Sequence, residues 1–374
     1  MVAISLARSY WNRKIAVGTD PPYPELKKSH TMAHAGRPWR DHKPPPSGPV
    51  WSIIQAGNTY WMLVAAIDLG LFDALEDLGK QTSEGLAHHL QVSASHLQHL
   101  LDSMVTLGFL DQLNDVYELN ETAERYLCRN GAASMASLVR VSPGPLENWI
   151  NLAETIRSGE VGTPVEDDMA GFYGPLVQAT FPTQHRVASR VGLHLGWQRI
   201  PNLHILDLGA GCAPWAIAVL ERSLKSTAVV NELPELIGLA ETMIEERGLS
   251  TRTQFRAGNF HDIPLEPEAF DLVALGHVCR SEGPELAPTL IERAVGALKP
   301  GGKLLVADYF ADNQRKLNQF GVHMGMTMLA NTVRGRILTH EQMHSWLSRH
   351  ELEAIRMIEP IAFNMVYVAT KKIP

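Results

Sequence analysis

Residues 204–215 read HILDLGAGCAPW and decide how the rest of the chain is organised. The first five residues are mostly apolar, which predicts a short buried strand of a parallel sheet. Gly209 and Gly211 then allow a sharp turn and let a ligand approach backbone amides directly, and residues 216–220 (AIAVL) predict a helix. The stretch therefore predicts the nucleotide-binding corner of a doubly wound α/β sheet, with the ligand at the carboxyl end of the strand.

The neighbouring residues favour a ligand without a pyrophosphate. A dinucleotide site needs a third glycine three residues after the second, but that position holds Pro214, preceded by Ala213. Residues 227–231 (TAVVN) predict the next strand, which leads into Glu232. A carboxylate at that point accepts hydrogen bonds from two ribose hydroxyls. The expected ligand has a ribose and no phosphates.

Length and composition bound the class of protein. The chain has 374 residues, of which 45% are hydrophobic and 20% charged, so it can bury a large core and form two domains. A formal charge of −7 gives no electrostatic reason to expect nucleic acid or an anionic membrane as partner, and a small molecule is expected instead. The longest apolar run, residues 60–67, is far shorter than the roughly 20 residues that a membrane span needs.

The three cysteines, Cys128, Cys212 and Cys279, are widely spaced and odd in number, which indicates neither a disulfide framework nor a thiolate metal site and fits a reducing cytoplasm. We expect no metal. Residues 1–46 are rich in proline with scattered basic residues, so they predict a disordered or extended tail. The first part of this tail weakly resembles a transit peptide, and a translation start at Met32 is an alternative to Met1.

Residues 47–140 predict a winged-helix domain. Apolar residues recur at helical spacing through residues 50–75 and predict two helices with broad apolar faces, which need a partner surface and so predict a homodimer. The faces include Trp51, Ile54, Trp61 and Val64. Two capped helices follow, at residues 82–90 and 93–107, and then a hairpin of residues 110–113 and 116–119. The second of these helices has no Lys or Arg, so DNA binding is not expected.

Residues 141–200 predict linking helices that line a substrate pocket, with breaks near residues 159–164 and near Pro182. Residues 201–374 predict the sheet domain. Strands are expected at residues 204–208, 227–231, 253–257, 271–275, 303–307, 353–358 and 364–369. Helices separate most of the strands, which predicts a parallel sheet, but none separates the last two, which predicts an antiparallel pair.

Three motifs together resemble the class I methyltransferases that use S-adenosylmethionine. They are Asp207 with Gly209 and Gly211, residues 257–260 (AGNF) and residues 297–302 (ALKPGG). With the N-terminal winged helix, the chain is similar to the small-molecule O-methyltransferases related to caffeic acid and hydroxyindole enzymes. The resemblance implies a Rossmann-like seven-stranded sheet, a dimer that closes the partner's pocket, S-adenosylmethionine as cofactor and a secondary-metabolite-like acceptor.

The resemblance also implies which residues bind the cofactor. Asn259 stands where the family usually has an Asp that contacts the adenine amino group, and Phe260 would stack on adenine. Glu232 remains the ribose anchor. The expected cofactor-binding residues are Asp207, Gly209, Gly211, Glu232, Leu233, Asn259, Phe260 and Gly276.

The expected catalytic residues depart from the family pattern. The family's catalytic histidine falls on Arg280, and a guanidinium has no acceptor lone pair and a pKa above about 12, so it cannot act as a base. One of the two flanking carboxylates of the family maps to Asp308, whereas the other maps to Ile337. The usual proton relay is therefore broken.

Three interpretations remain open. In the first, Arg280 holds an acceptor that is already nucleophilic, such as a carboxylate, an enolised carbon or an acidic phenol. In the second, His277, His185 or His323 serves as the base. In the third, the chain resembles the methyltransferase-like pericyclases, which bind the cofactor without consuming it. A cofactor-binding scaffold without catalysis is a fourth class of protein.

The apolar helix expected at residues 320–330 would cap the substrate pocket with adaptable side chains, which by family analogy suits a planar aromatic or polyketide-like acceptor. An equal alternative is that the apolar side chains of this helix only fill the core and do not line the pocket. The candidate substrate residues are His185, His323, Met324 and Met328. The identity of the acceptor, the methylated atom and whether methyl leaves the sulfur at all are not readable from the sequence.

Overall fold

The structure, a computed structural model, describes residues 47–142, 144–361 and 363–374. The predicted tail, residues 1–46, lies outside the described residues. The chain divides into two compact units, residues 1–58 and 59–374. The described part of the first unit is the beginning of helix α2 (Gly48–Asp68), along which Val50, Trp51 and Ile53 are exposed.

The second unit begins with the remainder of α2 and the winged-helix elements. In chain order these are α3 (Leu71–Leu78), β1 (Gln81–Thr82), α4 (Ser83–Leu90), α5 (Ala94–Thr106), β2 (Leu110–Leu113), β3 (Val116–Leu119) and α6 (Glu121–Tyr126). The three strands form an antiparallel sheet in the order β1-β3-β2, which confirms the predicted hairpin. Thr82 begins α4 as its sequence position predicts, because its hydroxyl accepts a hydrogen bond from Gly85 N at 3.2 Å.

The linking segment is helical. It contains α7 (Ala136–Val141), α8 (Leu146–Ile150), α9 (Leu152–Ser158), the short 3-10 helix η1 (Val165–Asp168), α10 (Met169–Leu195) and a second 3-10 helix, η2 (Trp197–Arg199). The predicted break after α9 is confirmed, because Gly159 ends this helix in the left-handed conformation.

The predicted break near Pro182 is wrong, because α10 continues through it. Proline removes one backbone N–H and crowds the preceding turn, at a cost of about 3 kcal/mol in a helix interior. Pro182 itself is exposed, whereas Phe181, Val187 and Val191 of the same helix are buried in the core that α10 shares with the sheet. Packing of this long apolar face outweighs the lost hydrogen bond.

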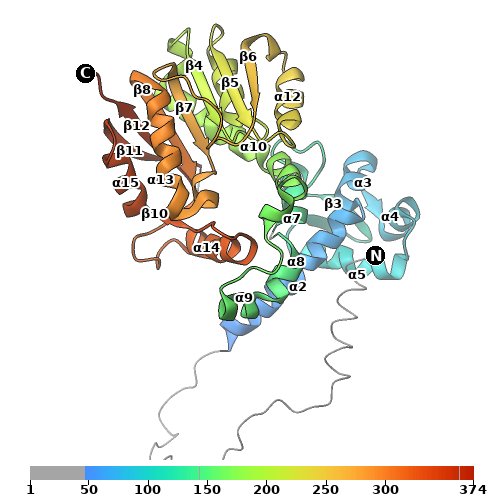
Figure 1. Cartoon of the computed structure of the whole chain (residues 1–374). Helices are drawn as coiled ribbons and strands as arrows, with labels where there is room; N and C mark the ends of the chain where they lie inside the picture. Colours follow the sequence, from blue (N-terminus) through green and yellow to red (C-terminus); the bar gives the residue numbers. More distant parts are fainter. Residues whose placement is uncertain (1–46, 143, 362) are drawn as a thin grey trace, which may run out of the picture. The chain divides into compact units, whose positions relative to one another are not determined.

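Seven strands form the large sheet, in the order β11-β12-β8-β7-β4-β5-β6 (Figure 1). They are β4 (His204–Leu208), β5 (Thr227–Glu232), β6 (Thr253–Ala257), β7 (Phe270–Gly276), β8 (Leu298–Asp308), β11 (Leu352–Ile361) and β12 (Asn364–Lys371). Neighbouring strands from β6 to β8 are parallel, and β12 is antiparallel to both β8 and β11. The predicted parallel sheet with an antiparallel final pair is confirmed.

Helices cover both faces of this sheet. Ile205 of β4 packs into a core cluster with residues of α10, α11 (Pro214–Arg222) and α12 (Ile237–Glu245). Leu206, the next residue, points to the opposite face and packs with residues of α13 (Cys279–Ala297) and α15 (His340–Ser348). The remaining elements are η3 (Ser250–Arg252), β9 (Phe310–Ala311), α14 (Gln319–Asn331) and β10 (Leu338–Thr339).

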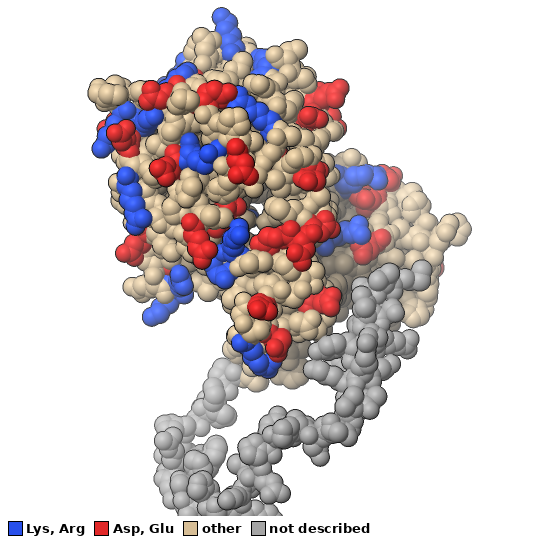
Figure 2. Space-filling view, in the orientation of Figure 1, with Lys and Arg blue, Asp and Glu red and all other residues tan. Residues whose placement is uncertain are grey.

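The carboxyl ends of the parallel strands lie side by side. Leu208 at the end of β4 is paired with residues of β5 and β7, Glu232 with Ala257, and Gly276 with Ala307. Every candidate residue that follows one of these strands therefore belongs to one edge of the sheet. Acidic and basic side chains are interspersed over the part of the sheet domain that faces the reader in Figure 2. In the described part of the chain, no helix is both long and apolar enough to cross a membrane.

Candidate active site

The glycine turn after β4 leaves no room for side chains. Gly209 and Gly211 both have left-handed backbone conformations, with φ of 63° and 56°. A Cβ atom at Gly209 would lie 2.6 Å from Val278 Cγ1 and 3.2 Å from Phe260 Cε1. Glycine at this position is therefore required by both the backbone and the close approach of these two side chains.

Ala213, which follows the two glycines of the turn, also has a left-handed backbone. Its φ of 57° and ψ of 41° lie in the left-handed region, which costs a non-glycine residue about 1–2 kcal/mol. The strain is held by hydrogen bonds on both sides, from Ala213 N to Ala210 O at 2.8 Å and from Ile217 N to Ala213 O at 3.0 Å. The turn keeps its path into α11, where Pro214 takes the first helical position.

Glu232 closes the turn from the neighbouring strand. Its carboxylate accepts hydrogen bonds from Gly211 N at 2.6 Å and from Leu233 N at 2.8 Å, one on each oxygen. Burial raises the pKa of Glu232, and the two backbone donors act in the opposite direction. Each oxygen keeps a second lone pair, so the carboxylate can accept two further hydrogen bonds from a ribose.

Buried polar atoms beside the turn show unused hydrogen-bonding capacity. Among the described residues, Asp207 Oδ1 and Trp215 Nε1 have no hydrogen-bond partner, although both are shielded from solvent. Burial and the nearby Glu232 carboxylate raise the pKa of Asp207 to about 7. The unpaired Asp207 oxygen and the remaining lone pairs of the neighbouring Glu232 carboxylate fit a ligand that brings hydroxyl donors and positive charge. This corner therefore fits S-adenosylmethionine, which carries both.

The loop after β6 brings the expected adenine-side residues to the same corner. Phe260 lies against Gly209, as described above, and Asn259 accepts a hydrogen bond from His261 N at 2.8 Å. His261 Nε2 in turn bonds Glu282 Oε2 at 2.6 Å and so links this loop to α13. Gly276 at the end of β7 faces Trp215, because a Cβ there would lie 2.7 Å from Trp215 Nε1.

A buried polar group surrounds Asp308 at the end of β8. We call it the Asp308 group, and its members are Gln184, His277, Arg280, Asp308 and Tyr309. Asp308 is fully buried and accepts hydrogen bonds from Arg280 Nη1 at 2.6 Å, Arg280 N at 3.0 Å and Tyr309 N at 2.9 Å. The guanidinium carbon of Arg280 lies 5.2 Å from the centre of the Tyr309 ring. The structure thus brings together the three expected catalytic residues.

His277 lies between Arg280 and helix α10. Its Nδ1 is 2.9 Å from Arg280 Nη1, and its Nε2 is 2.7 Å from Gln184 Oε1. Its ring centre lies 4.8 Å from that of Tyr309. His277 has a φ of 65° and donates its backbone N–H to Ala307 O at 2.7 Å. A non-glycine residue in this conformation stores strain that the surrounding contacts must hold.

The charges of the Asp308 group follow from these contacts. Burial alone would raise the pKa of Asp308, but the Arg280 cation and the His277 contact lower it to about 2. Burial opposes the charge on Arg280, yet the Asp308 carboxylate leaves its pKa above the ordinary value. Burial lowers the pKa of His277. At neutral pH the group therefore holds an ion pair and a neutral imidazole.

The expected substrate residues are spread more widely. Phe320, at the start of α14, lies 5.0 Å from Tyr309 between ring centres, so this helix reaches the Asp308 group. Farther along α14, Met328 is buried, Met324 is half-buried and His323 is exposed. His185 bonds Glu221 of α11 at 2.8 Å instead of any member of the Asp308 group.

Three polar residues near the Asp308 group were absent from the expected site: Gln184, Tyr309 and Tyr173. Tyr309 directly follows Asp308, so its nearness was available from the sequence. Gln184 is buried on α10, and its amide also donates to Asn364 Oδ1 at 3.3 Å. Tyr173, on the same helix, has its hydroxyl 3.5 Å from Ser281 Oγ. Gln184 lies in the linking segment that was expected to line a pocket, but its specific partners could not be predicted because they lie on distant segments.

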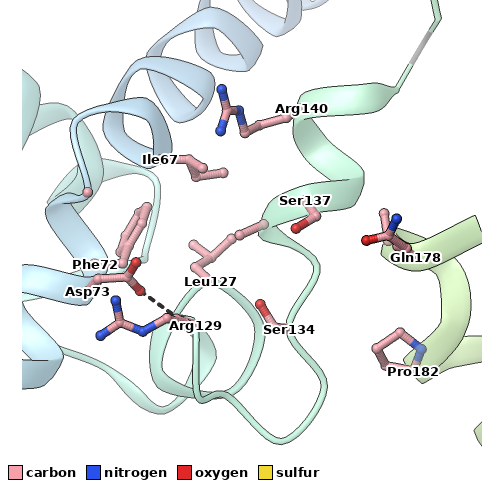
Figure 3. A pocket seen from close by; sticks show the side chains of 13 residues that line it. Ile67, Phe72, Asp73, Leu127, Arg129, Ser134, Ser137, Arg140, Gln178 and Pro182 are labelled. Atoms are coloured by element: carbon pink, nitrogen blue, oxygen red, sulfur yellow. Dashed lines mark hydrogen bonds between the residues drawn. The ribbon is translucent and has the colours of Figure 1, made fainter. Parts of the chain in front are cut away.

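A cavity of about 330 Å³ lies elsewhere in the second unit (Figure 3). Its walls come from the segment around Phe72 and Asp73, from the segment around Leu127 and Arg129, and from Gln178 and Pro182 of α10. Arg129 N donates to Asp73 Oδ1 across one side. Neither the glycine turn nor the Asp308 group contributes to its lining.

Comparison with known proteins identifies the family. The O-methyltransferase dimerisation domain family matches residues 51–129, and the O-methyltransferase domain family matches residues 194–350. A tetracenomycin polyketide synthesis 8-O-methyltransferase from Streptomyces glaucescens is 26% identical over 299 residues, covering 76% of this chain and 85% of that protein. An N,N-dimethyltransferase from Streptomyces rimosus is 28% identical over 275 residues, covering 70% and 78%.

A solved structure shares the fold of this chain. The structure of human N-acetylserotonin methyltransferase in complex with S-adenosylmethionine superposes with a TM-score of 0.74 at 23% identity, covering 89% of this chain and 100% of that chain. The two matched domains define a methyltransferase with a dimerisation domain on its N-terminal side. The chain belongs to the S-adenosylmethionine-dependent O-methyltransferase family. These matches do not favour the pericyclase-type interpretation.

Proposed function

We propose that this enzyme methylates a small-molecule acceptor that is already nucleophilic near neutral pH, such as a carboxylate, an enolate or an acidic phenol. The observation that carries the proposal is the Asp308 group, in which a guanidinium replaces a proton acceptor. The bound cofactor supplies an electrophilic methyl group on a sulfonium. The protein's main task is then to align the acceptor with that methyl.

No member of the Asp308 group offers a free base. Arg280 has no acceptor lone pair. Asp308 is a weak base because its pKa is about 2, and both of its oxygens already accept hydrogen bonds. His277 has a contact at each ring nitrogen. These contacts support an acceptor that needs no proton removed by the enzyme.

Arg280 has N–H groups left for the acceptor, because neither its Nε nor its Nη2 makes a hydrogen bond among the described residues. Its Nε is also buried. The Asp308 carboxylate balances the guanidinium charge, so Arg280 offers directed N–H groups and only a small net attraction for an anion. An acceptor that is held by hydrogen bonds suits this arrangement better than one that needs a full counterion.

Cofactor binding is assigned to the residues of the glycine turn and its neighbours. Glu232 would accept the ribose hydroxyls, and Phe260 would pack on the base beside Asn259. On the acceptor side, α14 supports a wall of aromatic and methionine side chains, because Phe320 contacts Tyr309 there. His323, Met324 and Met328 remain candidate substrate residues.

We also infer that the enzyme is a homodimer. The matched dimerisation domain includes α2 from Trp51 onward. Side chains of α2 that a monomer would leave in water include Trp51, 60% exposed, and Trp61, 50% exposed. Large exposed aromatic residues on one helix are typical of a protein interface.

The experiment that tests the proposed reaction uses cofactor labelled in its methyl group and mass spectrometry of the products. The panel contains acidic phenols and carboxylates, including the hydroxynaphthoate class named for a relative from Streptomyces sahachiroi. We expect label in the product and a pH–rate profile that follows the pKa of each acceptor. Product of unchanged mass would overturn the proposal. A pH–rate profile with the same apparent pKa for every acceptor would also overturn it, because an enzyme group would then control the rate.

A further inference from the structure

Resting on the proposed function, we propose that Gln184 is a positioning residue: it fixes the tautomer of His277 and, through His277, the orientation of the Arg280 guanidinium. Gln184 is 7% exposed and lies on α10, whereas the other members of the group lie at or after the ends of β7 and β8. Among the described residues, no hydrogen bond joins Gln184 to the glycine turn or to Arg280.

The direction of each hydrogen bond follows from donor chemistry. A guanidinium only donates, so the 2.9 Å contact between Arg280 Nη1 and His277 Nδ1 requires a lone pair on Nδ1. The proton of the neutral ring is then on Nε2, which donates to Gln184 Oε1 at 2.7 Å. The Gln184 amide nitrogen faces Asn364 Oδ1 at 3.3 Å, which is consistent with this orientation of the amide.

A second arrangement competes with the first one. His277 Nδ1 is also 3.6 Å from Asp308 Oδ1. If the ring proton moved to Nδ1, the imidazole would donate to Asp308, and Arg280 Nη1 would lose its second acceptor. The oxygen of Gln184 selects against this state, because only the Nε2–H tautomer can donate to it.

The surroundings favour a neutral ring. The charged or titratable groups that face His277 are Arg280 from α13, Asp308 at the end of β8 and Tyr309, which follows it, and α10 contributes the uncharged Gln184. The Arg280 and Asp308 charges offset each other beside the ring. Burial lowers the pKa of His277, which supports the neutral form over the physiological range.

The consequence for catalysis is indirect. Arg280 Nη1 is shared by Asp308 and His277, and two acceptors on one nitrogen restrict rotation of the guanidinium. The remaining N–H groups of Arg280 are thereby held in fixed directions. Gln184 thus acts on the acceptor through two intervening side chains, and His277 is a hydrogen-bonding support for Arg280 and not a base.

Nitrogen NMR of the whole enzyme labelled at histidine tests the proposal without a methyl acceptor. The His277→Gln spectrum identifies the His277 signals among those of the other histidines. We expect the wild-type ring to show a protonated Nε2 and an unprotonated Nδ1, with no titration between about pH 5.5 and 8.5, a range that spans the ordinary histidine pKa. A protonated Nδ1, or titration near the ordinary pKa, would overturn the proposal.

Two variants at Gln184 separate a positioning role from a packing role. Gln184→Leu removes the acceptor, so we expect His277 to populate the Nδ1–H tautomer or to titrate, and kcat to fall about 10-fold, the effect of one lost net hydrogen bond. Gln184→Glu keeps an acceptor oxygen, so the Nε2–H should remain while the pKa of His277 rises. Arg186→Gln, at an exposed position of the same helix, is the matched control and should leave the His277 signals unchanged.

The readouts distinguish failure of this inference from failure of the proposed function. An unchanged tautomer in a folded Gln184→Leu enzyme rejects the positioning role, whatever the reaction is. If Gln184→Leu does not fold, the wild-type tautomer and the pKa shift in Gln184→Glu decide the question. A correct tautomer pattern in an enzyme that transfers no methyl would reject only the proposed reaction.

Discussion

Arg280 puts a fixed donor where the resemblance expects a proton acceptor. We expect activity to fall in the order Arg280, Arg280→Lys, Arg280→Ala, because lysine keeps the charge but loses the planar set of donors. The alanine variant should lose about 10²–10³-fold in kcat, as when one oxyanion donor is removed. Steady-state kinetics measures this order, and calorimetry should show S-adenosylmethionine affinity nearly unchanged.

Arg157→Ala is the control for this series, because Arg157 forms an exposed ion pair with Glu154 on α9 and should not affect turnover. Arg280→His should not restore a base-assisted reaction, since Ile337 supplies no carboxylate to hold the new imidazole. Full turnover by Arg280→Ala would show that this cation takes no part in the chemistry.

Glu232 is the residue on which cofactor affinity should depend most. Glu232→Ala removes the acceptor of the ribose hydroxyls, and hydrogen bonds to a charged group are worth about 1.5–3 kcal/mol, roughly 10- to 100-fold in the dissociation constant. Calorimetry with S-adenosylmethionine measures the change. Glu266→Ala removes an exposed carboxylate that pairs with Arg256 and serves as the control. Equal affinities in the two variants would contradict the assignment.

Asp308 should make stability depend on pH in the acid range. Its folded pKa is about 2, below the ordinary value, so its contribution is fully present above the ordinary pKa and is lost as pH falls through the folded value. The shift corresponds to about 2–3 kcal/mol of unfolding free energy between roughly pH 5 and pH 2. Urea unfolding at several pH values measures this loss, to which other carboxylates also contribute.

Asp308→Asn isolates the contribution of this carboxylate. At pH 7 it should lower the unfolding free energy by about 3–5 kcal/mol, because Arg280 is left buried without its anion. In this variant, the loss of unfolding free energy on acidification should be correspondingly smaller. Asp68→Asn breaks an exposed ion pair with Arg140 and should change stability by less than about 1 kcal/mol. Equal effects of the two substitutions would contradict a buried Asp308 pair.

At the scale of single elements, α10 is held by packing in spite of its sequence. Pro182→Ala restores an N–H to the helix interior and should raise the unfolding free energy by about 1–2 kcal/mol, after allowing for the greater freedom of the unfolded chain. Pro214→Ala, at the first position of α11, should give no such gain, because that N–H has no intrahelical partner. Urea midpoints of the two variants measure the difference.

The elements that were predictable from sequence are those specified locally. The turn at Gly209 and Gly211 follows from backbone freedom, and the hairpin of β2 and β3 follows from alternation around Asn114 and Asp115. The parallel sheet followed from the alternation of strands and helices, and its antiparallel final pair from the absence of a helix between the last two strands. In each case a few neighbouring residues contain the physical cause.

The parts that escaped prediction depend on distant contacts. The continuation of α10 through Pro182 depends on the apolar face that it buries against the sheet domain. Gln184 joins the Asp308 group across 93 residues of sequence to His277. The same limit applies to His323, whose helix was expected but whose exposure was not. The partners against which a helix packs determine which of its side chains are buried, and a single sequence does not identify these partners.

At the scale of the whole molecule, assembly should depend on α2. Trp61→Glu puts a charge on an exposed aromatic position within the matched dimerisation domain and should shift the protein from dimer to monomer at micromolar concentration. Light scattering measures the mass. Leu113→Glu, at a 73% exposed position of the β2–β3 hairpin, is the matched control and should remain dimeric. A wild-type monomer would contradict the inferred homodimer.

The residues assigned to the cofactor follow the strands, whereas other site residues come from helices, and this separation affects how new acceptor specificities can arise. The residues assigned to the cofactor follow β4, β5, β6 and β7, whereas α10 and α14 contribute Gln184 and Phe320 from outside the sheet. If α14 forms the acceptor wall as we propose, exchanging it with that of a relative should change this wall and leave the sheet edge intact. A library confined to α14 and the exposed turns of α10 therefore explores new products while each member keeps the same methyl donor.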